Sequence, residues 1–305
     1  MTKRKFPDMV LRRRFTEDQK AHFVSTYLSE GGTTRAARVC GVTPQIIWKY
    51  AKSAGVLKDY FKTVDHDYFS VIDCERKAYW LGMLMADGNV CDSGRNHVVS
   101  LTLCTQDADH VRQFRSDLGS THALTVIKPR VTGTAQSRMG VIRSQGAVSC
   151  RFNSPKMIAD LAKCGIGPRK TFSAEPWDGP PELMRHYWRG ALDGDGCISH
   201  KFSRNRYGSW VINLVGSLPV VTEFGKFCER VSGSKANPSH VGRRVPVLSV
   251  CGNKVVKVIL DSLYGGIEIA LPRKWEAAKR ATTYTPSGHL LSEVRMGRGS
   301  KFSPL

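Results

Sequence analysis

The sequence predicts an α+β protein with two similar units, residues 73–175 and 176–280, preceded by a small all-α domain at residues 15–58. The main observation is an internal repeat: residues 79–90 read YWLGMLMADGNV, and residues 187–198 read YWRGALDGDGCI. Aligned without a gap, both copies follow the pattern Tyr-Trp-x-Gly-x-Leu-x-small-Asp-Gly. Each copy is followed by strand-like and helix-like apolar patterns in the same order, which indicates a duplicated unit.

The two copies are predicted to form two helices that pack closely together. Gly82 and Ala86 are spaced i, i+4, and so are Gly190 and Gly194, so each pair leaves one helix face free of large side chains. Two such faces can approach each other at short range and bring both helix ends together.

Each copy ends in an aspartate followed by glycine, Asp87-Gly88 and Asp195-Gly196. The glycines suit the left-handed position after a helix C-terminus. A carboxylate is unfavourable there, because the helix end carries partial negative charge and a second carboxylate adds repulsion. One Asp-Gly pair would more simply be a turn. Two matched pairs favour a site for hard divalent cations, as in metal-dependent phosphodiester hydrolysis.

The elements after each copy are predicted from alternating and helical apolar patterns. In the first unit these are a strand at 97–105, a helix around Phe114, a strand at 147–152 and a helix at 154–165. In the second they are a strand at 210–215, a helix around Phe224, a strand at 246–250 and a helix at 253–265.

Residues 33–55 of the N-terminal domain match a helix-turn-helix, with Gly41 at the turn. Ile47, with Trp48 or Tyr50, would anchor the second helix in the domain core. Such a helix can lie in the major groove of DNA, although a small protein-binding module has the same pattern. The exposed face of this helix would carry Gln45, Lys49 and Lys52.

The composition indicates a polyanionic partner. The chain has 46 Lys and Arg against 26 Asp and Glu, a formal net charge of +20. Nucleic acid is favoured over membrane because no apolar run approaches membrane length. The N-terminal MTKRKFPDMVLRRR lacks the apolar segment of a secretion signal, so we expect a cytoplasmic protein of prokaryotic or phage origin. The nine scattered cysteines are expected to be reduced thiols.

The paired stretches resemble the motifs of single-chain LAGLIDADG homing endonucleases, with WLGMLMADG (80–88) and WRGALDGDG (188–196) in the motif positions. Met85 stands where the first motif Asp is expected, and Arg189 where a small residue is usual. The resemblance implies that Asp87 and Asp195 bind Mg²⁺, or Mn²⁺ in its place. It also implies two antiparallel sheets that form a saddle over DNA, in a monomer with internal pseudo-twofold symmetry.

The same resemblance assigns a lysine after the last helix of each unit to the active centre, which gives Lys170 and Lys274. They would polarise the attacking water or stabilise charge at the phosphate. Ordinary phosphate contact, or a solvated lysine, is the alternative. Further candidates for DNA contact are basic residues of the strands and loops: Arg138, Arg143, Arg151, Arg204, Arg206, Arg243 and Arg244.

The predicted function is that of a site-specific endonuclease, intron-encoded or freestanding, that cuts a long asymmetric duplex target. The family implies cleavage across the minor groove with 3′ overhangs. The alternatives are a DNA-binding regulator that does not cut and an RNA maturase, with intron RNA as its ligand. The remaining parts of the chain are assigned as a basic arm (1–14), a linker (59–72) and a basic flexible tail (281–305).

Overall fold

The computed structural model describes residues 15–56, 63–94, 96–132, 142–143, 145–202, 208–239 and 245–283. The chain divides into two compact units, Met1–Lys62 and Thr63–Leu305. Among the described residues, no helix combines the length and the apolar character that crossing a membrane requires.

The first unit contains the helices α1 (Glu17–Glu30), α2 (Thr33–Cys40) and α3 (Pro44–Ser53). Thr16 and Gln19 form a capping box at the start of α1, and left-handed glycines follow α1 and α2. The core that joins the helices consists of Phe23, Tyr27, Ala36, Ala37, Ile47 and Ala51.

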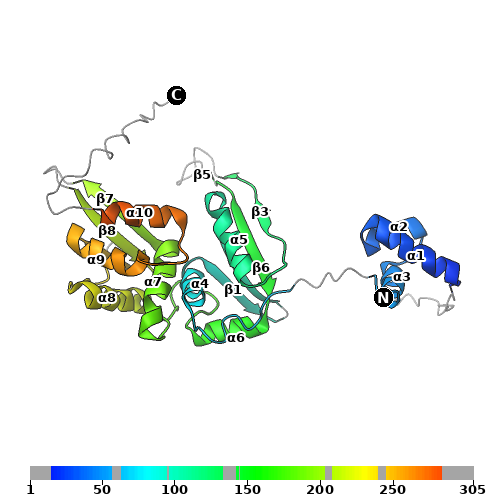
Figure 1. Cartoon of the computed structure of the whole chain (residues 1–305), viewed down its shortest axis with the longest axis horizontal. Coiled ribbons are helices and arrows are strands. Elements are labelled where there is room, and N and C mark those ends of the chain that lie inside the picture. The colour runs from blue at the N-terminus through cyan, green and yellow to red at the C-terminus, as the bar shows by residue number, and fades with distance from the viewer. Residues whose placement is uncertain are drawn as a thin grey trace, which may run out of the picture. The chain divides into compact units, whose positions relative to one another are not determined.

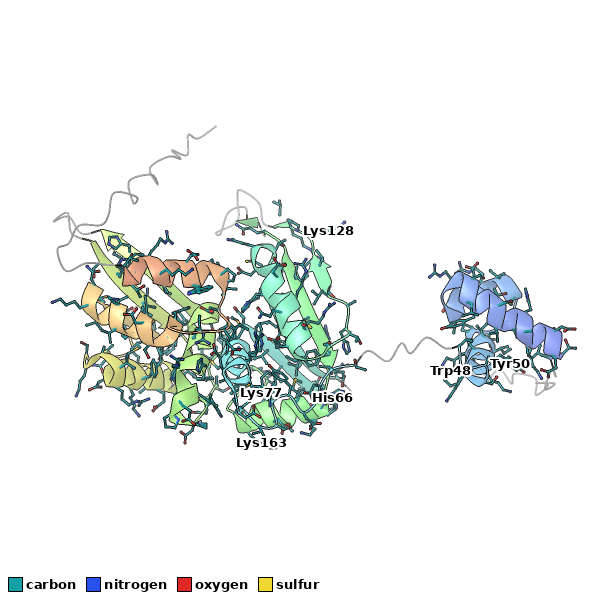
Figure 2. The ribbon with its side chains drawn as sticks, viewed as in Figure 1. Trp48, Tyr50, His66, Lys77, Lys128 and Lys163 are labelled. Atoms are coloured by element: carbon teal, nitrogen blue, oxygen red, sulfur yellow. The ribbon has the colours of Figure 1, made fainter. Side chains whose placement is uncertain are left out.

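On α3 the core-facing residue is Ile47, which is fully buried, whereas Trp48 is 49% exposed. Tyr50 is partly buried against the core and against Phe15 and Phe23. Of the two anchors left open by the sequence, Tyr50 is therefore the one used, and Trp48 lies on the same open surface as Lys52 (Figure 2).

The second unit is a mixed helix and strand structure. Its first half contains α4 (Glu75–Ala86), β1 (Gly88–Ser93), β2 (Asn96–Cys104), the 3-10 helix η1 (Thr105–Asp107), α5 (Ala108–Asp117), β3 (Thr125–Ile127), β4 (Val131–Thr132), β5 (Ile142–Arg143), β6 (Ala147–Asn153) and α6 (Pro155–Lys163). Its second half contains α7 (Pro181–Asp195), β7 (Gly196–Phe202), β8 (Gly208–Val215), α8 (Leu218–Ser232), β9 (Val247–Cys251), α9 (Asn253–Tyr264) and α10 (Pro272–Thr282).

The strands of this unit pair in antiparallel sheets. One sheet has the order β1-β2-β6-β3, another the order β7-β8-β9, and β4 pairs with β5. Helices α4 and α7 lie side by side between the two larger sheets (Figure 1). One hydrophobic core runs through both halves, so the two sheets and the central helices form a single packed body.

In its described part, the segment predicted as a linker (59–72) has its apolar side chains Val64, Tyr68 and Phe69 buried in the core of the second unit. One expectation from the sequence is wrong: the glycines after α4 and α7 are not left-handed, since Gly196 has φ −95° and Gly88, which belongs to β1, has no positive φ.

Gly88 and Gly196 are required by close approach instead of by their backbone conformation. A Cβ on Gly88 would lie 2.4 Å from the carbonyl oxygen of Leu84, and a Cβ on Gly196 would lie 2.4 Å from that of Leu192. Each strand therefore leaves its helix at a sharp angle directly after the motif aspartate.

Candidate active site

The site begins with the contact between α4 and α7, which is close enough for the two backbones to touch. A Cβ on Gly82 would lie 2.0 Å from the carbonyl oxygen of Tyr187, and a Cβ on Gly190 would lie 2.0 Å from that of Tyr79. No side chain can occupy such a space, since a methyl carbon and a carbonyl oxygen stay about 3.3 Å apart. The predicted helix-packing role of the two glycines agrees with this geometry.

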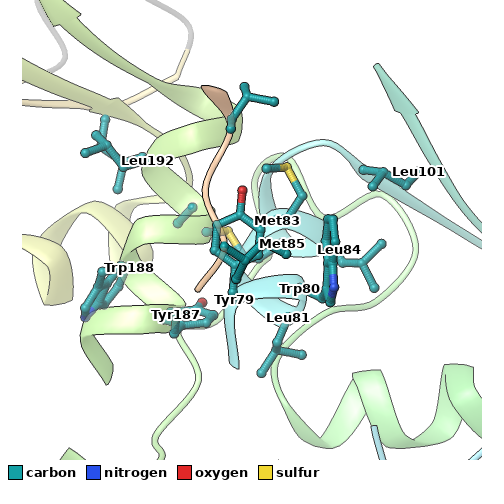
Figure 3. Packing of buried hydrophobic residues seen from close by; sticks show 14 of the residues in the cluster. Tyr79, Trp80, Leu81, Met83, Leu84, Met85, Leu101, Tyr187, Trp188 and Leu192 are labelled. Atoms are coloured by element: carbon teal, nitrogen blue, oxygen red, sulfur yellow. The ribbon is translucent and has the colours of Figure 1, made fainter. Parts of the chain in front are cut away.

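The side chains beside this contact point away from it in pairs. Figure 3 shows Tyr79 and Tyr187 near the line where the helices meet, with Trp80 and Trp188 directed to opposite sides. Trp80 donates its indole N–H to Asp117 at 2.8 Å, and this hydrogen bond joins α4 to α5. The contact is therefore held by small residues at its centre and by aromatic residues at its edges.

Ala86 and Gly194 continue the contact to the ends of the helices. A Cβ on Gly194 would lie 2.4 Å from the Cβ of Ala86 and 3.1 Å from Oδ2 of Asp87. The carboxylate of Asp87 thus lies against Gly194 in the last turn of α7, and Gly194 is the residue before Asp195. The structure brings together the two acidic residues that the sequence separates by more than one hundred positions.

The electrostatics of the pair show that the two carboxylates influence one another. Burial, followed by the negative charge of Asp195, raises the pKa of Asp87 to about 6. Burial also raises the pKa of Asp195: although the residue is exposed to solvent, many protein atoms lie around its carboxylate. The positive charges of Lys170 and Lys274 act in the opposite direction on both carboxylates. Two acids and two lysines therefore form one electrostatic cluster.

Lys170 and Lys274 occupy corresponding places at the two helix ends. Lys170 donates from Nζ to the carbonyl oxygens of Met85 and Ala86, at 2.5 Å each. Lys274 donates to the carbonyl oxygen of Leu192 at 3.4 Å and also to that of Gly196. Carbonyls at a helix C-terminus carry partial negative charge, so they hold an ammonium group well.

Burial lowers the pKa of both lysines, and it does so more than the nearby carboxylates raise the pKa of Lys170. Lys274 is 6% exposed, while Lys170 keeps more contact with solvent. Their ammonium protons are thus easier to release than those of solvated lysines, which suits groups that exchange protons or donate to a phosphate.

The donor set fits a hard divalent cation. Within the described part of the chain, no cluster of three or more His, Cys, Asp and Glu side chains is placed to hold a metal. Mg²⁺ does not require such a cluster, because it keeps several waters and is bound by one or two carboxylates together with substrate phosphates. Asp87 and Asp195 supply two carboxylates with raised pKa values, which a cation would return to the charged form.

Arg273 is a site residue that the sequence interpretation missed. It donates from Nε to Asp107 at 3.0 Å, and its charge also lowers the pKa of Asp87. Asp107 is 5% exposed and precedes α5, so this ion pair joins the two halves next to the acid pair. The Arg-Lys pair at 273–274 was the available signal, but only its lysine was assigned.

The sheets next to the site each turn one face away from the core. In β2 and β6, Leu101, Cys150 and Phe152 face the core. On the opposite face Ser100 pairs with Arg151 and Thr102 with Ser149; Arg151 and Thr102 are exposed, whereas the two serines are buried between their neighbours. In β8 and β9, Ile212 and Leu248 face the core, and Asn213 pairs with Ser249 on the other side. Small polar and basic side chains of this kind can donate and accept in a DNA groove.

The predicted DNA contacts can be placed only in part. Arg151 is exposed on β6. Arg143 belongs to β5, where the structure describes its backbone alone. Arg138, Arg204, Arg206, Arg243 and Arg244 lie outside the described residues. Lys128, after β3, is exposed at the end of the first sheet (Figure 2).

In the first unit, Gln45, Lys49 and Lys52 are all exposed on α3, as the sequence predicts. Trp48 lies among them, with Nζ of Lys52 at 4.9 Å from the centre of its ring. The helix therefore presents an aromatic side chain within a basic surface. Contact of this surface with DNA stays a prediction, with contact to a protein as the alternative.

No family model and no curated protein matches the sequence. The chain is similar in structure to the LAGLIDADG homing endonuclease I-GzeII in complex with its DNA target, with 9% identity over 67% of this chain and 88% of that chain, and a TM-score of 0.46. It is also similar to the homing endonuclease I-WcaI bound to its DNA recognition sequence, with 11% identity over 73% and 97% of the two chains and a TM-score of 0.43.

A third similar structure is the I-LtrWI LAGLIDADG homing endonuclease bound to target DNA, with 9% identity over 71% of this chain and 89% of that chain, and a TM-score of 0.42. All three TM-scores lie below 0.5, so the proposals below depend on the chain's own residues. The solved structures to which this chain is similar include homing endonucleases of the family that its paired motifs resemble.

Proposed function

We propose that the protein is a metal-dependent endonuclease that hydrolyses phosphodiester bonds of duplex DNA. The observation that carries the proposal is the convergence of Asp87 and Asp195 at the touching ends of α4 and α7, each with a lysine bound to the same helix end. A fold has no structural use for two mutually repelling carboxylates at helix C-termini. A divalent cation between the two carboxylates would neutralise their repulsion and would also bind a phosphate of the substrate.

The residues divide the chemistry in the following way. Asp87 and Asp195 would hold Mg²⁺, or Mn²⁺, which when bound neutralises both carboxylates and acts as a Lewis acid toward water and phosphate. Lys170 is bound to the end of α4 and Lys274 to the end of α7. Each lysine would orient the attacking water or stabilise negative charge on the transferring phosphate, one lysine for each strand.

DNA is the polyanion that suits the rest of the molecule. The net charge of +20 favours a phosphate backbone as partner, and the polar faces of the two sheets carry hydroxyl, amide and guanidinium groups. Two non-identical sheets would read a long asymmetric site. We further propose that α3, with Gln45, Lys49 and Lys52, extends this footprint as the second helix of a helix-turn-helix.

The test is cleavage of a duplex that carries the genomic sequence flanking this gene, with Mg²⁺ and with EDTA. The expected result is cutting at one position only when Mg²⁺ is present. Asp87→Asn should abolish cutting and leave binding of the same duplex intact. Asp178→Asn, a change of the same kind at an exposed carboxylate outside the site, is the matched control and should cut normally.

Cutting by Asp87→Asn at the wild-type rate would refute the assignment of the acid pair. Tight binding of the duplex by the wild type without cutting, in Mg²⁺ and in Mn²⁺, would instead identify a DNA-binding regulator or an RNA maturase. A comparison of structured intron RNA with duplex DNA as ligands would then separate these two.

A further inference from the structure

The connection between α9 and α10, residues 265–271, is tied to α7 by a buried carboxylate that the proposed chemistry does not use. Asp193 accepts a hydrogen bond at Oδ1 from the hydroxyl of Tyr264 at 2.5 Å. Its Oδ2 accepts from the backbone N–H of Leu271 at 2.6 Å. Tyr264 is the last residue of α9 and Leu271 the residue before α10, so one carboxylate holds both ends of the connection.

Arg189, one turn earlier on the same face of α7, binds the connection at one further point, Ile269, and the last turn of α9 at Leu263. Its guanidinium donates to the carbonyl oxygens of Ile269 and Leu263, at 2.9 Å each. The side chain is fully buried, as is that of Asp193. A buried charged group is costly unless it is paired and hydrogen-bonded, so loss of these partners would destabilise the protein.

The partners of both residues on the other side come from α4. Glu75 accepts from Arg189 at 2.6 Å and from the N–H of Glu268 at 2.9 Å. Tyr79 donates its hydroxyl proton to Asp193 at 2.8 Å. Glu75 and Tyr79 are also spaced i, i+4, so the two hydrogen-bonded pairs lie one helix turn apart between α4 and α7. We call these four side chains the polar ladder: Glu75 with Arg189, and Tyr79 with Asp193. The connection 265–271 is hydrogen-bonded to this ladder.

The polar ladder is linked to Lys274 through Leu271. Leu271 is the residue before α10, and its carbonyl oxygen accepts from the N–H of Lys274 at 2.9 Å. From there the lysine side chain reaches the carbonyls of Leu192 and Gly196, which flank Asp193 and Asp195 in the chain. The bond from Asp193 to Leu271 therefore joins α7 to the first turn of α10, which carries Lys274.

Among the described residues of the first half, no corresponding set of buried polar side chains is found. In the gapless alignment of the two motifs, the positions of Arg189 and Asp193 are taken by Leu81 and Met85. Lys170 lies in a backbone turn, where the N–H of Ala174 bonds to its carbonyl oxygen at 2.9 Å. The two lysines thus reach matching positions by different means, and only one of them depends on Asp193.

We propose that Asp193 is a positioning residue that sets Lys274 at the end of α7, so that its loss impairs cleavage of one DNA strand and spares the other. This inference rests on the endonuclease proposal. The inference goes beyond the endonuclease proposal in two respects. It assigns a role to a buried residue outside the acid and lysine cluster, and it predicts that the two halves position their lysines by different interactions.

The experiment measures the cleavage rate of each strand separately, on the duplex described above with a different label on each strand. Lys274→Met first identifies the strand that requires Lys274. Asp193→Asn should slow cleavage of that same strand by about 100-fold, since a misplacement near 1 Å has an effect of that size. The other strand should change by less than about threefold, which a general loss of packing or of DNA binding would not produce.

Tyr264→Phe serves as a second variant, because it removes a single hydroxyl and preserves the shape of the core. It should slow the same strand by about tenfold, the effect of losing one hydrogen bond to a buried carboxyl group. Tyr187→Phe is the matched control: Tyr187 stands at the motif position of Tyr79, and its hydroxyl accepts from the N–H of Trp177 instead. This control should leave both strand rates at the wild-type level.

A double variant makes the test independent of absolute rates. If Asp193 acts through Lys274, then Asp193→Asn combined with Lys274→Met should cut that strand no more slowly than Lys274→Met alone. Equal slowing of both strands by Asp193→Asn and by Tyr264→Phe, or additive effects in the double variant, would overturn the inference while the endonuclease proposal stands. A wild-type protein that cuts neither strand would refute the endonuclease proposal and this inference with it.

Discussion

The contact between α4 and α7 is most directly probed by giving Gly190 a methyl group. In Gly190→Ala the new carbon would lie 2.0 Å from the carbonyl oxygen of Tyr79 and 2.8 Å from the N–H nitrogen of Met83. Since such a carbon and oxygen stay about 3.3 Å apart, the helices would have to separate by about 1.3 Å at this point. Both neighbours are backbone atoms of a helix, so neither can turn aside.

The expected free-energy change follows from two opposing effects. Overpacking of this kind costs about 3 kcal/mol, the upper part of the usual range. Alanine is favoured over glycine within a helix by about 1 kcal/mol, which offsets part of that cost. The net loss of about 2 kcal/mol should lower the melting temperature by about 4–8 °C in a unit of this size.

Cleavage should suffer more than stability, because the two acidic residues lie at the ends of the separated helices. We expect cutting to slow by about 100-fold at a temperature where the variant is fully folded. The assays are thermal melting followed by circular dichroism and single-turnover cleavage. Gly167→Ala is the control: a Cβ there meets no atom within 4 Å, so its melting temperature should stay within about 1 °C of wild type. A Gly190→Ala protein that melts and cuts like wild type would refute the close backbone contact.

Three further predictions concern other parts of the molecule. Asp87→Asn should stabilise the metal-free protein at pH 8, because burial and then the charge of Asp195 raise the pKa of Asp87 from 3.8 to about 6. The cost to the wild type is absent below pH 4, where the group is protonated in both states, and grows as the pH rises to about 6, so the two melting curves should converge in acid. Asp160→Ala should cost about 2 kcal/mol at pH 7. Burial alone would raise the pKa of this carboxyl, but hydrogen bonds from Lys156 and Lys163 lower it below its ordinary value of 3.8. Urea titrations should therefore show a constant loss above pH 4 that shrinks progressively as the pH falls below 4. Trp48→Ala should weaken DNA binding about tenfold, measured by fluorescence anisotropy, with an unchanged melting temperature because the ring is 49% exposed; equal affinities would exclude this surface of α3 from the interface.

The repeat in the sequence was sufficient to predict the centre of the structure. Matching Gly and Asp residues in both copies are a local pattern, and the small residues they contain have one evident use, which is close helix packing. Strand and helix positions in both halves followed from apolar periodicity, which is also local. The two aspartates and both lysines could therefore be singled out from the sequence, while their catalytic roles stay predictions.

The parts that could not be predicted depend on partners distant in the chain. Arg189 stands out in the motif as a large charged residue, yet its partners Leu263 and Glu75 are 74 and 114 positions away. Arg273 likewise pairs with Asp107, 166 positions away. For Gly88 and Gly196 the residue type was informative but its cause was misjudged, because steric contact and left-handed backbone conformation both select glycine.

The polar ladder also determines which halves can associate. In a hypothetical pair of two second halves, Arg189 would meet Leu183, the residue that takes the motif position of Glu75, and the guanidinium would be buried without a counter-charge. Breaking a buried ion pair in this way costs about 3–5 kcal/mol, and each copy would incur that loss once. Two first halves would lack the arginine altogether. The buried charges of Arg189 and Glu75 therefore favour pairing of each half with the other half over pairing with a second copy of itself.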